Sequence, residues 1–274
     1  MKKIAINGLT LSYRDSGDGL PFVFQHGLGG DAHQTADVVP LIKDGATPLR
    51  VVTLECRGQG ASPLGADEPS ISQFAQDVSM LIQELNLDKP VIGGISMGAA
   101  IALRLAAQNP NDYRGLVIAR PAWNTTPSPP NMQVFALAAA LMKTHGAQQG
   151  LLKFAETPAA TELRRQSQDN YSSLMEQFQA PDTQARARLL AAIAADGPGV
   201  SQATLATLKL PTVVIGNADD VVHPLSMAQS IAAAIPSARF TEIPSKTVSR
   251  DAYRAAFQKS LMTFFHDLTE HQSA

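Results

Sequence analysis

The chain has 274 residues, of which 45% are hydrophobic and 17% charged, and its formal net charge is -2. This length allows one sizeable core with a subsidiary lid, and the charge balance gives no reason to expect a nucleic-acid partner. The single cysteine, Cys56, excludes an internal disulfide. We find neither a secretory signal nor an apolar run of transmembrane length, so we expect a cytoplasmic protein without a membrane partner.

Short β-rich runs alternate with helical patterns in the first part of the chain. Lys3 to Ile6 and Leu9 to Arg14 predict two strands joined by a turn at Asn7-Gly8. The clearest helix spans Ile71 to Leu85, where apolar residues recur at three- and four-residue spacing. Four buried strands are predicted as well, at Pro21–Gln25, Arg50–Leu54, Pro90–Gly94 and Gly115–Ala119. This alternation is typical of an α/β fold with a mainly parallel sheet flanked by helices.

The pattern changes between residues 124 and 209, where we find helical stretches and prolines but no convincing strand. Alternation then resumes with a strand at Pro211–Ile215, a helix at Pro224–Ile235, a strand at Arg239–Ile243 and a last helix from about Asp251. We therefore predict a core of residues 1–123 and 210–274 and an inserted helical cap of residues 124–209. The alternative is a set of extra helices packed beside the sheet.

The strongest chemical signal is Gly94-Ile95-Ser96-Met97-Gly98, between a buried strand and a helix rich in small residues. A strand-to-helix turn this sharp strains the backbone of Ser96, and its neighbours two residues away must be nearly free of side chains. The hydroxyl then projects above the sheet at the positive end of the helix. We predict that Ser96 is a catalytic nucleophile.

A second glycine-rich turn, His26-Gly27-Leu28-Gly29-Gly30, follows the strand that ends at Gln25. Acyl transfer needs two backbone N–H groups that face the developing oxyanion. We assign these to Leu28 and to Met97, the residue after the serine. His26 is placed in the substrate pocket, although a histidine at a strand end more often makes structural hydrogen bonds.

The stretch Glu55-Cys56-Arg57-Gly58-Gln59-Gly60-Ala61-Ser62 resembles the Asp-x-Arg-Gly-x-Gly-x-Ser motif of the α/β-hydrolase superfamily, with Glu55 in place of the usual aspartate. With the two motifs above and the Gly-x-x-Asp of residues 216–219, this resemblance covers essentially the whole chain. It implies the α/β-hydrolase fold and a Ser-His-Asp triad whose acid is Asp219. Asp220 is the local competitor, interpreted as a turn cap, and Arg57 is interpreted as structural.

The resemblance also implies a histidine in the loop after the last strand, and here the sequence departs from the family. A count without gaps puts Val248 at that position, and none of the six histidines lies in the loop. Three explanations stay open. His223 or His33 could supply the base from elsewhere, Tyr253 or Lys246 could act with a depressed pKa, or the protein could bind a ligand without catalysis.

Arg120 and Trp123 follow the Gly115–Ala119 strand and face the same edge as Ser96. Arg120 could receive an anionic substrate group, with Trp123 lining the pocket. Arg120 pairing with Glu55 or with an aspartate across the edge is an equal alternative.

These features predict a hydrolase of a small ester, lactone or related acyl substrate that acts through Ser96. The alternative is a catalytically impaired protein of the same fold that binds a small molecule under its cap. We expect no metal and no cofactor, because the chain has no His-x-x-x-His motif, no paired cysteines and no dinucleotide-binding glycine fingerprint. The composition fits a monomer or a homodimer.

Overall fold

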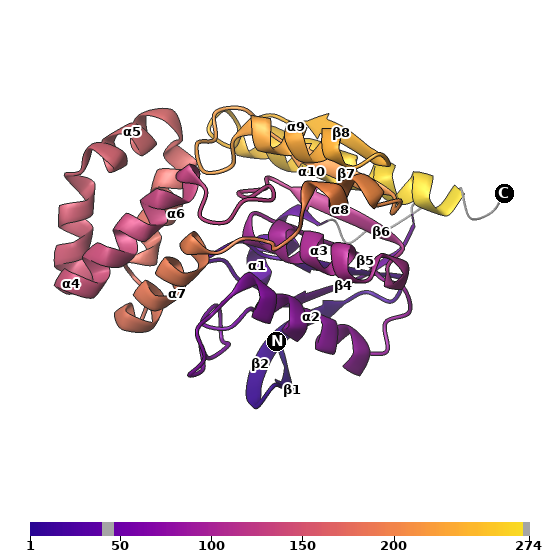
Figure 1. Cartoon of the computed structure of the whole chain (residues 1–274), viewed down its shortest axis with the longest axis horizontal. Coiled ribbons are helices and arrows are strands. Elements are labelled where there is room, and N and C mark those ends of the chain that lie inside the picture. The colour runs from indigo at the N-terminus through magenta and orange to yellow at the C-terminus, as the bar shows by residue number, and fades with distance from the viewer. Residues whose placement is uncertain (40–46, 271–274) are drawn as a thin grey trace.

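The computed structural model describes residues 1–39 and 47–270, which form one eight-stranded sheet with the order β1-β2-β4-β3-β5-β6-β7-β8 (Figure 1). β1 and β2 are antiparallel to their neighbours, and the remaining strands run parallel. The strands are β1 Lys2–Ile6, β2 Leu9–Ser16, β3 Leu20–Gln25, β4 Leu49–Leu54, β5 Val91–Ile95, β6 Gly115–Ala119, β7 Thr212–Gly216 and β8 Ala238–Glu242. The predicted mainly parallel α/β sheet is confirmed.

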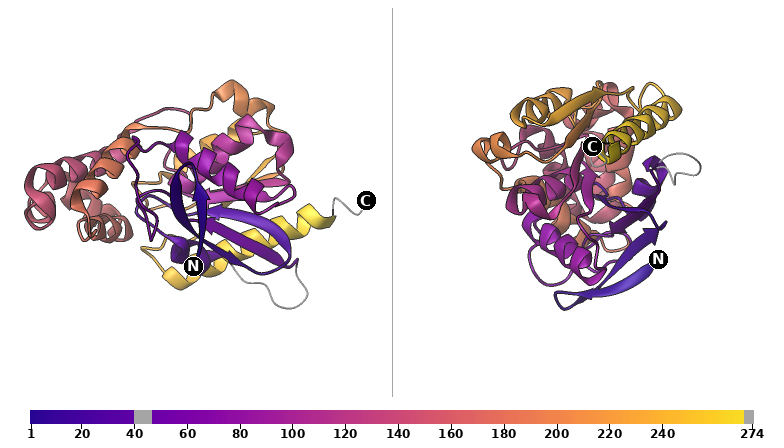
Figure 2. Two further views of the ribbon diagram at one scale, coloured as in Figure 1. Left: turned by 90° about the horizontal axis from the view of Figure 1, so that it is seen from below. Right: turned by 90° about the vertical axis from the view of Figure 1, so that its right-hand side faces the viewer.

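Helices cover both faces of the sheet because its central strands are apolar on both sides. Every residue of β5, β6 and β7 is buried. One face carries α2 (Ile71–Glu84), α3 (Met97–Gln108), α8 (Gln202–Thr207) and α9 (Leu225–Ala234), and the other carries α1 (Ala32–Val38) and α10 (Arg250–Glu270). Figure 2 shows α10 and the α2–α3 pair on opposite sides of the strands.

β6 and β7 are adjacent in the sheet although almost a hundred residues separate them, since Leu116 pairs with Thr212 and Ala119 with Ile215. Before α8, the intervening chain forms the 3-10 helix η2 (Pro130–Met132) and the helices α4 Gln133–Ala155, α5 Pro158–Gln166, α6 Gln168–Gln177 and α7 Thr183–Ala195. We call α4–α7 the helical insert. These helices gather at one end of the sheet (Figures 1 and 2), and their role as a cap stays a prediction.

Local sequence explains where the insert helices begin. The Thr157 side chain accepts a hydrogen bond from the Ala160 amide, with Pro158 in the first helical turn, and Asp182 accepts from the Ala185 amide. Gly146 has a φ of 74° inside α4, a left-handed conformation that kinks this helix. Within the described parts of the chain, no helix combines the length and the apolar character needed to cross a membrane.

Candidate active site

Ser96 occupies the sharp turn between β5 and α3 and has a φ of 57° and a ψ of -113°. The backbone packs so closely around this turn that only glycine fits two residues before and two residues after Ser96. A Cβ on Gly94 would lie 2.3 Å from the Gly98 carbonyl carbon, and a Cβ on Gly98 would lie 2.3 Å from the Gln25 carbonyl oxygen. The Ser96 amide donates to the Ala119 carbonyl at 3.0 Å, which ties the turn to β6. The geometry is that expected of a strand–nucleophile–helix turn.

The loop after β3 lies directly against this serine, since a Cβ on Gly27 would sit 3.3 Å from Ser96 Cβ. Side chains brace the loop on both sides of Leu28. The Gly27 amide donates to Gln34 Oε1 and the Gly29 amide to Gln59 Oε1, both at 2.6 Å. Met97 is the first residue of α3, so its amide has no acceptor within the helix. The two predicted oxyanion donors therefore lie on the two segments that flank Ser96.

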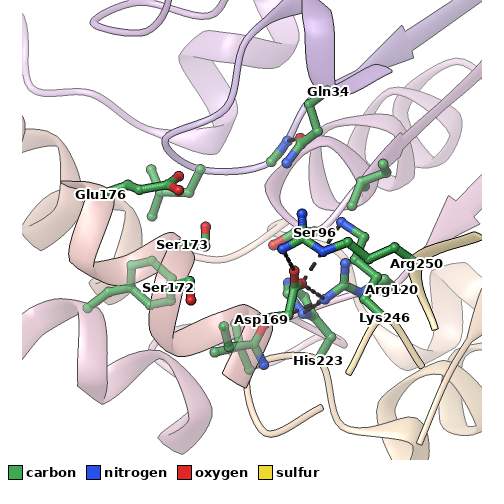
Figure 3. A pocket seen from close by; sticks show the side chains of 16 residues that line it. Gln34, Ser96, Arg120, Asp169, Ser172, Ser173, Glu176, His223, Lys246 and Arg250 are labelled. Atoms are coloured by element: carbon green, nitrogen blue, oxygen red, sulfur yellow. Dashed lines mark hydrogen bonds and ion pairs between the residues drawn. The ribbon is translucent and has the colours of Figure 1, made fainter. Parts of the chain in front are cut away.

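A pocket of about 220 Å³ opens above Ser96 between the sheet and the helical insert (Figure 3). Core elements contribute the strand-end loops, α1 and the start of α10, and the insert contributes α4 and α6. The residues that line it are Gly27, Leu28, Gln34, Ile95, Ser96, Arg120, Phe135, Asp169, Asn170, Ser172, Ser173, Glu176, Val222, His223, Lys246 and Arg250. Of the predicted site residues, Ser96, Leu28, Arg120 and His223 meet here.

His223, in the loop after β7, is held by a buried carboxylate. Its Nδ1 lies 2.9 Å from Asp220 Oδ1, and its amide donates to the same oxygen at 2.9 Å. Arg120 Nε and Nη2 donate to Asp220 Oδ2 at 2.9 and 2.6 Å. Burial alone would raise the pKa of Asp220, but the charge of Arg120 together with the interactions of His223 and Asn170 outweighs it and holds that pKa below its usual value. Burial lowers the pKa of His223, so the imidazole is neutral at pH 7.

The carboxylate beside the histidine is thus that of Asp220 and not that of Asp219. Asp219 is exposed, with a φ of 55°. Its carbonyl accepts a hydrogen bond from Ser167 Oγ. The Gly-x-x-Asp spacing predicted Asp219 as the acid, but the turn directs the side chain of Asp220 inward. Arg120 pairs with an aspartate across the sheet edge, as in the second of its two predicted roles, and it also lines the pocket.

The loop between β8 and α10 places a lysine in the pocket. Lys246 lines the cavity that contains Ser96, whereas Val248, at the position counted for the histidine, is 73% exposed. Burial and then the nearby guanidinium of Arg120 lower the pKa of Lys246. The loop therefore brings a basic side chain to the pocket, although not an imidazole.

Tyr253 belongs to the core beneath the site. Its ring packs against Phe257 and lies 5.6 Å from the Arg120 guanidinium carbon and 5.0 Å from Lys246 Nζ. Burial raises the pKa of its hydroxyl, which is the wrong direction for a base. We do not assign Tyr253 as the base.

Two residues predicted to line the substrate pocket lie elsewhere. His26 is fully buried, with Nδ1 2.8 Å from the Gly27 carbonyl oxygen and Nε2 accepting from the Cys56 amide at 3.0 Å. It therefore fixes the glycine-rich loop from below. Trp123 is 1% exposed, and its Nε1 donates to the Asp196 carbonyl at 2.9 Å. We place neither in the pocket, nor His33, whose side chain is 80% exposed.

Sequence reasoning missed the contribution of the insert and of α10. Asp169 and Asn170 come from α6, and Arg250 is the first residue of α10. Asn170 Nδ2 donates to Asp220 Oδ1 at 2.6 Å, which links the insert to the histidine's carboxylate. No local motif marks these residues, because their positions depend on how the insert folds back.

Comparison with known proteins agrees with this architecture. A family model described as the alpha/beta hydrolase fold matches residues 21–246. A protein of Pseudomonas savastanoi named as a carbamate hydrolase, RutD, is 28% identical over 90% of this chain and 94% of its own length. RutD of Klebsiella pneumoniae is 30% identical over 68% of this chain and 69% of its own.

Solved structures share the fold at lower identity. The enol-lactonase of Burkholderia xenovorans has a TM-score of 0.74 and 23% identity, covering 96% of this chain and 99% of its own. BpoC of Mycobacterium tuberculosis, named as a non-heme bromoperoxidase, has a TM-score of 0.70 and 24% identity and covers 97% of both chains. The family match and the sheet order agree, and the chain belongs to the α/β-hydrolase fold family.

Proposed function

We propose that the protein hydrolyses a small ester, lactone, carbamate or related acyl compound through Ser96, without a cofactor. The observation that carries this proposal is the His223–Asp220 pair in the pocket that Ser96 lines. An aspartate bound to Nδ1 fixes the imidazole tautomer and leaves Nε2 as the proton acceptor. The relatives named as hydrolases support the reaction class.

In the proposed mechanism, His223 takes the proton of the Ser96 hydroxyl while Oγ attacks the substrate carbonyl. The amides of Leu28 and Met97 donate to the oxygen that becomes negative. When the tetrahedral intermediate collapses, the leaving group takes the proton from His223 and an acyl-enzyme remains. A water molecule, deprotonated by the same imidazole, then releases the acid and restores Ser96. Asp220 stabilises the imidazolium in both steps, and the helical insert acts as a cap over the bound substrate.

Turnover of p-nitrophenyl acetate tests the proposal. We expect Ser96→Ala to fall to the uncatalysed background and His223→Gln to lose about 10³-fold or more in kcat. The wild-type rate should be constant above pH 6.5 and fall in more acidic buffer, because burial lowers the His223 pKa and only the neutral imidazole accepts a proton.

Lys246 is the competing base because it lies in the loop where the family histidine is expected. If Lys246 is the base, Lys246→Met loses more turnover than His223→Gln, and the assignment of His223 is wrong. We favour His223 because its carboxylate partner has the geometry of a catalytic pair, whereas Lys246 Nζ is 3.9 Å from its acidic partner, Asp169.

One observation favours a second candidate, a ligand-binding protein without turnover. The histidine belongs to the loop after β7 and not to the loop after β8. Wild-type protein with no turnover above the Ser96→Ala background, on acetate esters, lactones and carbamates alike, would support that candidate. Ligands that raise the melting temperature would then identify what the pocket binds.

A further inference from the structure

Three basic side chains of the core converge on one carboxylate of the helical insert, that of Asp169 on α6. Arg250 Nη2 lies 3.4 Å from Asp169 Oδ1, and Arg120 Nη2 and Lys246 Nζ lie 3.6 and 3.9 Å from Oδ2. Figure 3 shows the four side chains meeting next to Ser96. All five residues line the same pocket, so an anionic group at this point would lie beside the nucleophile.

These contacts are longer than those of the two buried arginine–aspartate pairs of the molecule. Arg57 donates to Asp77 at 2.7 and 2.9 Å, and Arg120 donates to Asp220 at 2.9 and 2.6 Å. Charge-assisted hydrogen bonds between nitrogen and a carboxylate typically span about 2.7–2.9 Å. Asp169 balances the cations but does not reach the distance that these donors prefer. A freely diffusing carboxylate is not tied to a helix and could approach more closely.

Lys246 depends on Asp169 for charge balance, whereas the Arg250 side chain is 75% exposed and is hydrated as well as paired. Arg120 is already paired with Asp220, whereas Asp169 is the only acidic partner of Lys246 and of Arg250 among the ion pairs of the described residues. A partly buried ammonium that loses its counter-ion is strongly destabilised. If the insert moves to admit a substrate, another anion at this point is favoured.

The remaining lining also suits a short, charged molecule. The pocket measures only about 220 Å³, and the insert side contributes polar side chains, Asn170, Ser172, Ser173 and Glu176, with Phe135 as its apolar member. A long acyl chain needs an extended apolar lining. The size and the polarity both favour a compact substrate.

We propose that Lys246 and Arg250, backed by Arg120, form a subsite for a carboxylate of the substrate, and that Asp169 occupies this subsite when no substrate is bound. The substrate class is then a short acyl compound that carries a free carboxylate, such as a hemiester of a small dicarboxylic acid. This inference rests on the proposed hydrolase function for the reaction, but the binding step stands without it.

Binding is measured in the Ser96→Ala background by isothermal titration with glutarate and with its neutral analogue glutaramide. We expect glutarate to bind more tightly than glutaramide, and Lys246→Met or Arg250→Met to weaken glutarate binding by about tenfold without changing glutaramide. Asp169→Asn should tighten glutarate several-fold because the internal competitor is gone. Lys246→Arg, which keeps the charge, should retain most of the affinity. This control separates the loss of charge in Lys246→Met from a folding defect.

Two matched controls exclude a general effect of surface charge. Arg254→Met removes an arginine from the same helix as Arg250, where it pairs with the exposed Asp37. Glu162→Gln removes an insert carboxylate that pairs with Arg165 on α5. Neither should change glutarate affinity. Equal affinities for glutarate and glutaramide, or weaker glutarate binding in Asp169→Asn, would overturn the subsite.

Kinetics separate the subsite from the reaction. With Ser96 intact, kcat/KM for mono-p-nitrophenyl glutarate should exceed that for p-nitrophenyl valerate, and Lys246→Met should remove the preference mainly through KM. Selective glutarate binding without turnover of either ester would support the subsite and contradict the hydrolase function. Turnover of both esters with equal kcat/KM would support the hydrolase function and contradict the subsite.

Discussion

Two buried arginine–aspartate pairs in this molecule have similar chemistry and different surroundings. Arg57 and Asp77 join the loop after β4 to α2, and their side chains are 2% and 1% exposed. Arg120 and Asp220 join the ends of β6 and β7, and their side chains are 6% and 2% exposed. The first pair lies away from the pocket and the second adjoins it.

The difference lies in how the carboxylate oxygens are used. Arg57 donates to both oxygens of Asp77, and Asn7 Nδ2 donates to Oδ1 as well. Both Arg120 donors go to Asp220 Oδ2, while Oδ1 accepts from Asn170 and from the His223 amide, and His223 Nδ1 lies 2.9 and 3.0 Å from the two oxygens. One pair therefore fixes two elements of the core, while the other holds a carboxylate against the His223 ring.

The largest expected effect is that of Asp220→Asn on catalysis. Loss of the carboxylate removes the group that sets the His223 tautomer and stabilises its charged form, so we expect kcat to fall by roughly 10³- to 10⁴-fold. Steady-state kinetics with p-nitrophenyl acetate measure kcat per folded molecule, because Asp220→Asn also leaves the buried Arg120 without its counter-charge. Asp219→Asn is the matched control and should stay within about twofold of wild type, because Asp219 is exposed. A larger loss in Asp219→Asn than in Asp220→Asn would restore Asp219 as the acid.

Asp77→Asn should affect stability and leave catalysis intact. It leaves the buried Arg57 guanidinium without its counter-charge, and breaking a buried pair in this way costs about 3–5 kcal/mol of unfolding free energy. Urea denaturation measures the loss, and kcat per folded molecule should match wild type. The double variant Arg57→Met/Asp77→Leu removes both charges and should recover most of the stability. A double variant as unstable as Asp77→Asn would mean that the pair's shape, and not its charge, matters.

The smallest effect is the dependence of stability on pH. Burial lowers the pKa of both His26 and His223, so below pH 6.5 the unfolded chain binds more protons than the native protein. The unfolding free energy should thus be highest above pH 6.5 and fall as the pH decreases through that value. Urea titrations at pH 7.5 and 5.5 test the sign. His26→Gln, whose amide can serve both the Gly27 carbonyl and the Cys56 amide, should reduce the slope, and an unchanged slope would exclude His26 as a contributor.

Much of the fold could be predicted from sequence because its signals are local. The Asn7-Gly8 turn, the 3–4 spacing of α2 and the apolar runs of β5, β6 and β7 each determine an element within a few residues. The Ser96 turn was predictable for the same reason, since its constraint is steric and lies within five residues.

The rest of the site depends on contacts between distant segments. Whether Asp219 or Asp220 points inward is decided by the turn geometry and by Arg120, a hundred residues earlier. Trp123 and His26 have side chains suited to a pocket, but hydrogen bonds to Asp196 and Cys56 hold them in the interior. Asp169 reaches Lys246 and Arg250 only because α6 folds back over the sheet, and no local pattern encodes that.

The most direct test of the central claim, that Ser96 is an activated nucleophile, is labelling with a fluorophosphonate followed by intact-mass measurement. We predict one adduct on the wild-type protein, none on Ser96→Ala and markedly slower labelling of His223→Gln. Labelling of Ser96→Ala at the wild-type rate, or no adduct on the wild-type protein after prolonged exposure, would contradict the account.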